Sequence, residues 1–423
     1  MVSTQRFLWG GSVATAALLL TWVSGGAGGC FVSGFTLVET GSTSSSTGGA
    51  NATSGGGDAS GGAGGTPDPC NAASVPTPPT TSDEGPDDQD FYVAFRSIEF
   101  GELESSEVPV VGYDLDGRCT CIEPDQVSCV APGQQSCDGF GGIDNAVSVL
   151  FALAQTFSEN FRSSFHSQRI ENGEWSVLLR VQGYNGQPVD DQVTVSLFAS
   201  SGLPEDPCID KDTPESLPKW DGSDRWPIMT VSLEPPNGGV GGGGVGTGGG
   251  GGGPTYVCGD PPEPGYSVDR PRFVDPFAFV KDGVLVANLP EAGLVFDGNG
   301  AAIDLTAGFI TGRLRRADND QWYLDDGRLA GRWAASDAIQ SVARFGGDQL
   351  CVGDSLYTSL KTAVCTRRDI TANIVGPTAP CDAVSFGMAF TAEPAQPGFV
   401  YVPNEDPGEP CPPGLDPADD SCD

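Results

Sequence analysis

The densest group of side chains that could do chemistry lies at 112–121, where the sequence reads Gly-Tyr-Asp-Leu-Asp-Gly-Arg-Cys-Thr-Cys. Carboxylate oxygens around a turn that glycine permits are the ligands that Ca²⁺ prefers. Further acids follow within thirty residues, so the segment predicts an irregular calcium site. The expected ligands are Asp114, Asp116, Asp138 and Asp144, with Glu123 as a further candidate.

The Asp-Leu-Asp-Gly sequence of this segment resembles the middle of calcium loops of the Asp-x-Asp-x-Asp-Gly type. The position of the first ligand in an EF-hand is occupied by Gly112, and no pair of helical patterns flanks the loop. A true EF-hand is therefore excluded. The alternative interpretation is a disulfide-pinned loop whose acids cap turns and the following helix.

Four cysteines in the same region, Cys119, Cys121, Cys129 and Cys137, raise the question of zinc. Zinc sites use pairs of cysteines two to four residues apart, and the seven-residue gaps here do not fit that spacing. In an exported chain such cysteines form disulfides. We therefore expect disulfides rather than zinc.

A second candidate site is the segment Trp-Asp-Gly-Ser-Asp-Arg-Trp at 220–226. Aromatic faces beside carboxylates suit stacking on a sugar ring and hydrogen bonds to its hydroxyl groups. The glycan-binding residues of this interpretation are Trp220, Asp221, Asp224 and Trp226. The alternative is that both tryptophans bury the loop against a core.

Catalytic patterns are weak in this sequence. His166 is the one histidine, which excludes a His-Glu-x-x-His metalloprotease, and the chain has no Gly-x-Ser-x-Gly nucleophile turn. Glu171 and Glu174 could be the two carboxylates of a glycosidase, but a chain with 56 acids contains many such pairs, so this pair is weak evidence. The glycine run at 237–254 lacks the following lysine of a phosphate-binding loop. We therefore expect a non-catalytic protein that requires no cofactor, apart from the candidate calcium ion.

The overall charge restricts the class of partner. The 423 residues include 21 Lys and Arg against 56 Asp and Glu, a formal net charge of −35. Nucleic-acid binding needs a basic face, so that class of function is excluded. The same charge disfavours electrostatic attraction to anionic lipid.

The amino terminus has the pattern of an export signal. Arg6 precedes an apolar run at 7–23, which is too short for a stable membrane span, and the sequence Ala-Gly-Gly-Cys then ends at Cys30. Small residues before a cysteine, after an apolar segment, resemble a bacterial lipobox. The resemblance implies that residues 1–29 are a signal peptide and that Cys30 carries lipid. The alternative is ordinary signal-peptidase cleavage without lipid, because Ala27 occupies the position where a lipobox has leucine. Phe31 is not the aspartate that retains many lipoproteins at the inner membrane, so the outer membrane is the expected destination.

Removal of Cys30 from the thirteen cysteines leaves an even number, as expected for an exported protein with paired cysteines. The cysteines expected in disulfides are Cys70, Cys119, Cys121, Cys129, Cys137, Cys208, Cys258, Cys351, Cys365, Cys381, Cys411 and Cys422. Plausible local closures are Cys351 with Cys365 and Cys411 with Cys422. A bond between Cys208 and Cys258, which flank the glycine run, would make that run part of a closed loop.

Composition divides the chain into segments. Residues 30–89 are rich in Ser, Thr, Gly and Pro and predict a disordered tether, since they have too little apolar surface to offset ordering. Residues 90–402 predict a β-rich globular region interrupted by the glycine run, or alternatively two domains at 90–236 and 255–402. Residues 403–423 form an acidic tail with proline and cysteine. A lipobox followed by such a linker is similar to the tethered lipoproteins of Gram-negative bacteria.

Alternating apolar residues predict strands at 91–100, 175–181, 193–198, 277–280, 284–287, 322–324, 329–333 and 384–390. Tight turns are expected at Asp282-Gly283 and at Asp326-Gly327. Helical spacing predicts one longer helix near 144–165 and short helices at 336–345 and 354–364. The expected fold is mainly β, with a β-sandwich or jelly-roll-like body. The expected function is a non-catalytic envelope lipoprotein, structural or binding a glycan or protein at the cell surface. The alternatives are a secreted glycan-acting jelly-roll enzyme and a calcium-stabilised adhesin.

Overall fold

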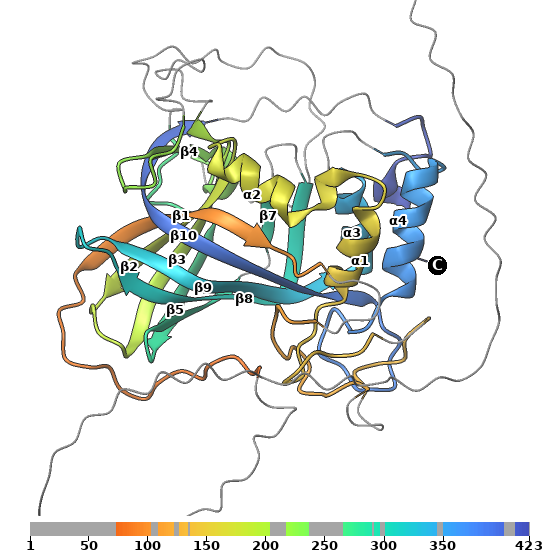
Figure 1. Cartoon of the computed structure of the whole chain (residues 1–423), viewed down its shortest axis with the longest axis horizontal. Coiled ribbons are helices and arrows are strands. Elements are labelled where there is room, and N and C mark those ends of the chain that lie inside the picture. The colour runs from red at the N-terminus through yellow and green to blue at the C-terminus, as the bar shows by residue number, and fades with distance from the viewer. Residues whose placement is uncertain are drawn as a thin grey trace, which may run out of the picture. The chain divides into compact units, whose positions relative to one another are not determined.

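The alternating strand segments of the sequence join into one closed barrel in the computed structural model (Figure 1). The structure describes residues 73–102, 109–121, 127–133, 136–203, 217–236, 265–289, 292–296, 301–344, 350–401 and 411–422. The barrel strands are β1 (Gln89–Glu99), β2 (Ser176–Tyr184), β3 (Asp190–Ser200), β5 (Phe273–Lys281), β6 (Val284–Leu289), β8 (Ala301–Arg316), β9 (Trp322–Ala334) and β10 (Ala383–Tyr401).

Closure of the barrel corrects the predicted sandwich or jelly roll. All eight strands are antiparallel to their neighbours, and β10 returns to pair with β1 from Tyr92–Ala395 to Glu99–Ala389. A sandwich has two sheets with free edges, whereas this pairing of the first and last strands removes the edges. The mainly β class was right and the arrangement was wrong, because the closing pair joins segments about 300 residues apart along the chain.

The strands on both sides of the glycine run belong to the same barrel. β3 precedes the run and β5 follows it, and the two strands pair directly. Two short strands lie off the barrel: β4 (Arg225–Met229) runs parallel to the end of β10, and β7 (Ala292–Phe296) pairs with β8. The described strands of 90–402 therefore form one sheet.

The interior of the barrel is filled by side chains. Phe95 stacks on Phe390 with 4.1 Å between ring centroids, and the fully buried Trp333 lies edge-on to Phe386. A Cβ atom on Gly327 would lie 2.5 Å from the ring of Phe390, so only glycine fits at that position. The barrel is a packed core at these levels rather than a lumen for a ligand.

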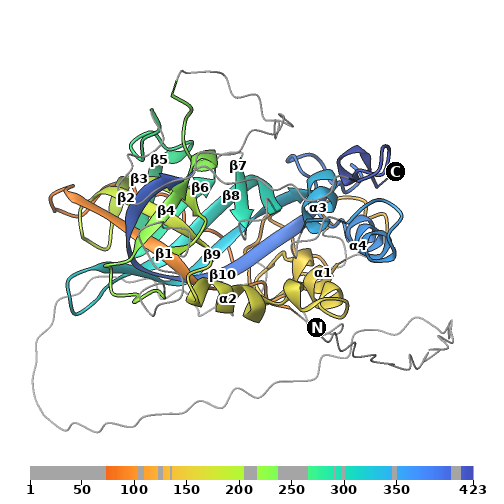
Figure 2. The same cartoon turned by 90° about the horizontal axis from the view of Figure 1, so that it is seen from above.

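Helices close one end of the barrel, where β9 ends and β10 begins (Figure 2). They are α1 (Ala146–Ala154), α3 (Ala335–Val342) and α4 (Ser355–Thr366), while α2 (Ser163–Glu171) lies against β1. Single 3₁₀ turns occur at η1 (Glu159–Phe161), η4 (Thr230–Ser232) and η5 (Pro417–Asp419). None of the helices among the described residues has both the length and the apolar character of a membrane span.

The predicted longer helix is divided into α1, η1 and α2. Its N-cap is Asn145 rather than Asp144, because the Asn145 side chain accepts the backbone N–H of Ser148. Ser158 then caps η1 and Arg162 is extended, so helical hydrogen bonding restarts at α2. The predicted short helices at 336–345 and 354–364 are confirmed as α3 and α4.

The two Asp-Gly pairs at which turns between strands were predicted, at 282–283 and 326–327, have different structural roles. Asp282 and Gly283 both have positive φ and form the two-residue turn between β5 and β6, as predicted. Asp326 also has a positive φ, but it lies inside β9, near a shift in the pairing of β8 with β9. The second pair is therefore an irregularity within one long strand and not a turn.

The N-terminal part of the body differs from the predicted tether. Residues 73–88 lie along the barrel: Ser82 bonds Asp191, the Asp83 N–H donates to the Val189 carbonyl at 2.9 Å, and Gln89 begins β1. Ordering beyond the predicted boundary follows from these backbone partners, which composition does not reveal. The rest of the predicted tether, the signal peptide and Cys30 lie outside the described residues.

Each of the nine described cysteines is in a disulfide. The bonds between described residues are Cys121–Cys137, Cys129–Cys381, Cys351–Cys411 and Cys365–Cys422. Both predicted local closures are wrong, because the acidic tail folds back over α4 and its two cysteines bond there instead. Asp420 of the tail adds bonds from Tyr357 Oη and Lys361 Nζ, each 2.7 Å long. Cys70, Cys208 and Cys258 lie outside the described residues.

Candidate metal centre

The predicted calcium ligands lie in a layer of loops on the outside of β8, β9 and β10. We call this the loop layer and define it as the described residues of 109–145 and 369–382. An antiparallel bridge between Tyr113 and Asp144 joins its two acidic segments. Asn145 fixes the layer to the barrel, because its Nδ2 donates to the carbonyls of Val111 at 2.9 Å and Gly387 at 3.0 Å.

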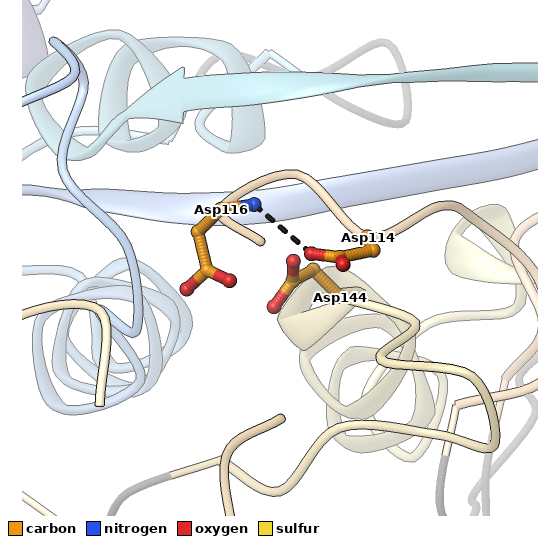
Figure 3. A group of neighbouring side chains, drawn as sticks. All are labelled: Asp114, Asp116 and Asp144. Carbon is orange, nitrogen blue, oxygen red and sulfur yellow. Dashed lines mark hydrogen bonds between the residues drawn. The ribbon is translucent and has the colours of Figure 1, made fainter. Parts of the chain in front are cut away.

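Three of the predicted ligands come together. Asp114, Asp116 and Asp144 each place a carboxylate oxygen within 4.8 Å of the others (Figure 3). Backbone N–H groups hold them in place: Gly117 donates to Asp114 and Leu115 donates to Asp144, both at 2.7 Å. The N–H of Arg118 donates to Asp116 over the same distance. These bonds orient the three carboxylates before any cation is present.

Asp138 and Asp144 are almost completely buried, at 5% and 4% exposure. Burial is the main cause that raises the pKa of both carboxyl groups, and the facing charges of Asp116 and Asp369 raise them further. Asp138 accepts the N–H of Thr120 and also contacts the carboxyl of Asp144. Both carboxyl groups therefore favour the protonated form unless a cation offsets the charge of the carboxylates.

One buried cation faces this cluster. Arg332 of β9 is 4% exposed, and its guanidinium donates to the Leu115 carbonyl at 2.6 Å and the Thr371 carbonyl at 2.7 Å. Asp369 accepts the N–H and the hydroxyl of Ser385, and burial raises its pKa to about 6. One guanidinium against five carboxyl groups leaves negative charge that a divalent cation would neutralise.

Sequence reasoning missed Arg332 and Asp369. They lie more than 200 residues from the Asp-Leu-Asp-Gly loop, and no local spacing connects them to it. Glu123, the fifth predicted ligand, lies outside the described residues. The residues that could hold a cation are therefore Asp114, Asp116 and Asp144, with Asp138 beside them; these carboxylates supply oxygen ligands of the kind that calcium prefers.

The predicted glycan-binding segment closes a core. Trp226 is fully buried, and Trp220 lies 5.3 Å from it, measured between ring centroids. Both oxygens of Asp224 accept the N–H of Lys219, and one also accepts that of Trp220. Trp226 therefore has no face to offer a sugar. The glycan prediction is left with Trp220, which also has Arg96 over its ring, and the exposed Asp221.

The residues considered for hydrolysis have structural partners. His166 is fully buried, with its Nε2 2.7 Å from the Asn160 carbonyl. Glu171 pairs with Arg96 and Glu174 with Arg169. These ion pairs lie at the surface of the molecule and use both carboxylates of the weak glycosidase pair.

The burial of His166 predicts a pH-dependent loss of stability. Burial lowers its pKa to about 4, and the unfolded chain binds the proton near pH 6.5. Stability is therefore complete above pH 6.5 and falls as the pH drops toward 4, by about 3 kcal/mol for a shift of this size. Urea unfolding across pH 4–8, compared with the His166→Gln protein, measures the difference. The carboxyl groups with raised pKa change stability with pH in the opposite direction. Because both proteins contain them, their contribution cancels in the difference between the two proteins. A difference that does not change with pH would contradict the assignment.

Comparisons of the chain with protein-family models, with curated proteins and with solved structures found no match. Within its described residues the chain combines a filled barrel, a disulfide-bonded loop layer and a cluster of carboxylates.

Proposed function

We propose that the mature chain is a non-catalytic lipoprotein of the cell envelope, attached through lipid on Cys30 and exposed outside the cytoplasm. The observation that carries the proposal is that all nine described cysteines are in disulfides. Disulfides in this number persist in oxidising compartments. The apolar run before Cys30 and the even number of remaining cysteines support the same route. A Gram-negative outer membrane is the proposed destination.

A non-catalytic role is favoured by the barrel. Where Phe95 packs on Phe390 and Trp333 on Phe386, aromatic rings fill the interior that a substrate cleft would need. The candidate catalytic groups are either buried, as His166 is, or held in ion pairs, as Glu171 and Glu174 are. We infer that the barrel is a rigid body that carries loops for contact with other molecules.

Metabolic labelling with an alkyne fatty acid tests the attachment. The chain expressed in a Gram-negative host should become labelled and fractionate with the outer membrane, whereas the Cys30→Ser protein should do neither. Cys70→Ser is the matched control, because it removes a cysteine without removing the lipid site. Labelling that survives the Cys30→Ser change, or an unlabelled wild-type chain, would contradict the proposal.

A second candidate function, a calcium-stabilised adhesin, is favoured by the distance of 4.8 Å or less between the carboxylate oxygens of Asp114, Asp116 and Asp144. Calcium that binds only the folded state should raise its stability by about 2.7 kcal/mol at a concentration a hundredfold above Kd. The melting temperature should rise with calcium and much less with magnesium, which demands near-ideal octahedral geometry.

Paired variants make the calcium prediction specific. The double variant Asp114→Asn and Asp116→Asn should lose the calcium-dependent shift. The Asp318→Asn protein, altered at an exposed acid in the turn between β8 and β9, should keep it. Equal shifts in all three proteins would show that calcium only screens an acidic surface. The loop would then be held by disulfides and turn chemistry alone.

A further inference from the structure

The loop layer carries a concentration of exposed apolar side chains. Ten large hydrophobic side chains are exposed among the described residues, and half of them belong to this layer. They are Val110, Val130, Phe140, Ile374 and Val375, with exposures of 62%, 57%, 68%, 81% and 52%. The same layer contains the buried aspartates. Exposed apolar groups that gather in one part of a surface favour contact with another apolar phase.

These side chains belong to segments that are fastened to one another. Gly139 lies directly on the carbonyl of Pro109, which places Val110 and Phe140 on touching stretches of backbone. Val130 donates to the Ala379 carbonyl at 2.8 Å, and its own carbonyl accepts the N–H of Cys381 at 3.0 Å. In Figure 1 the orange, gold and blue loops gather below α1 and α4. The segments that carry the apolar residues are therefore fastened to one another and are not independent loops.

The N-terminal chain joins the body at this same surface. Ala73, the first described residue, donates to the Gly141 carbonyl at 3.3 Å, and its own carbonyl accepts the N–H of Asp114 at 3.1 Å. Ala73 is thus bonded to the residue beside Phe140. The chain that leads to Cys30, 43 residues before Ala73, therefore leaves the body from the loop layer.

We propose that the loop layer is the membrane-facing surface of the protein, and that Val110 and Phe140 insert at the headgroup boundary of the bilayer that holds the lipid. The proposal depends on the lipid attachment proposed above. Exposed aromatic and aliphatic side chains favour the boundary, and the tether supplies a high local concentration of bilayer.

Charge determines the kind of bilayer that fits. The layer carries Asp114 and Asp116 at partial exposure, and the whole chain has a formal net charge of −35. Anionic headgroups therefore repel this surface. With zwitterionic headgroups, insertion of the apolar side chains is the main contribution to binding. We expect contact with zwitterionic vesicles to be stronger than with vesicles rich in phosphatidylglycerol.

Tryptophan quenching by brominated acyl chains tests the orientation. The Phe140→Trp protein and the matched Phe277→Trp protein both alter an exposed phenylalanine, and Phe277 lies on β5, outside the loop layer. The mature full-length chain is anchored to phosphatidylcholine vesicles in two ways, through its own lipid and through an N-terminal histidine tag on nickel-chelating lipid. Unbrominated vesicles give the reference emission in each case.

The expected result is a loss of emission in the F140W protein and no added loss in the F277W protein, with either anchor. Equal quenching of the two proteins, or none, in tag-anchored vesicles would overturn the membrane-facing surface. A protein that fails to associate through its own lipid but shows the expected quenching with the tag would contradict the proposed lipid attachment alone. Quenching that grows with phosphatidylglycerol content would contradict apolar insertion.

Discussion

Replacing Asn145 with alanine is expected to lower the free energy of unfolding by about 4 kcal/mol, because several buried polar groups lose their partner at once. Asn145 is 1% exposed. Its Nδ2 donates to the carbonyls of Phe100, Val111 and Gly387, and its Oδ1 accepts the N–H groups of Ser148 and Gly387. One side chain thus caps α1 and joins the loop layer, β10 and the end of β1.

The measurement is urea unfolding of the oxidised protein, followed by far-UV circular dichroism. Asn145→Asp retains the acceptor oxygen and removes the donor, so it should destabilise at least as much as alanine. Asn319→Ala, at an exposed asparagine between β8 and β9, is the matched control and should change stability by less than about 0.5 kcal/mol. A small effect at Asn145 would mean that water replaces its bonds and that the loop layer is held elsewhere.

The second large effect is expected at the disulfide between Cys129 and Cys381. This bond closes a loop with a sequence separation of 252 residues. Loop-closure entropy gives a stabilisation of about 5 kcal/mol for a loop of this length, near the upper end of the range for native disulfides. Replacing both cysteines with serine should therefore destabilise the protein more than removing any of the three other disulfides between described residues.

The Cys351–Cys411 disulfide supplies the comparison, with a separation of 60 residues. Its removal should destabilise the protein by about 1 kcal/mol less than removal of Cys129–Cys381, from the logarithm of the two loop lengths. Both double variants are measured by guanidinium unfolding under oxidising conditions. Equal losses, or a larger loss at Cys351–Cys411, would show that native packing and not loop closure dominates.

Local spacing was enough to predict several parts of the structure. The alternation along 384–390 predicted the first part of β10, and the Lys-Asp-Gly sequence predicted the turn after β5. These features depend on contacts between near neighbours, which composition and periodicity encode directly. The same method misassigned Asp326, because an Asp-Gly pair favours a positive φ both in a turn and inside a bent strand.

In the candidate site, too, contacts between near neighbours could be predicted and contacts between distant segments could not. Asp114 and Asp116 are two residues apart, and their grouping follows from one turn. Asp144 joins them only through the bridge from Tyr113, and Arg332 approaches from a barrel strand. No pattern within either segment indicates the other, so the buried charge balance of the cluster could not be predicted.

By itself, the sequence determined the mainly β class, the acidic charge and the thirteen cysteines available for disulfides. Each of these depends on which residues are present and on their near neighbours. Only the tertiary structure decided the barrel closure, the disulfide partners and the position of Arg332 among the aspartates. The barrel closure, the Cys129–Cys381 bond and the contact of Arg332 with Leu115 each join residues more than 200 positions apart, and such contacts form only when the whole core is buried together.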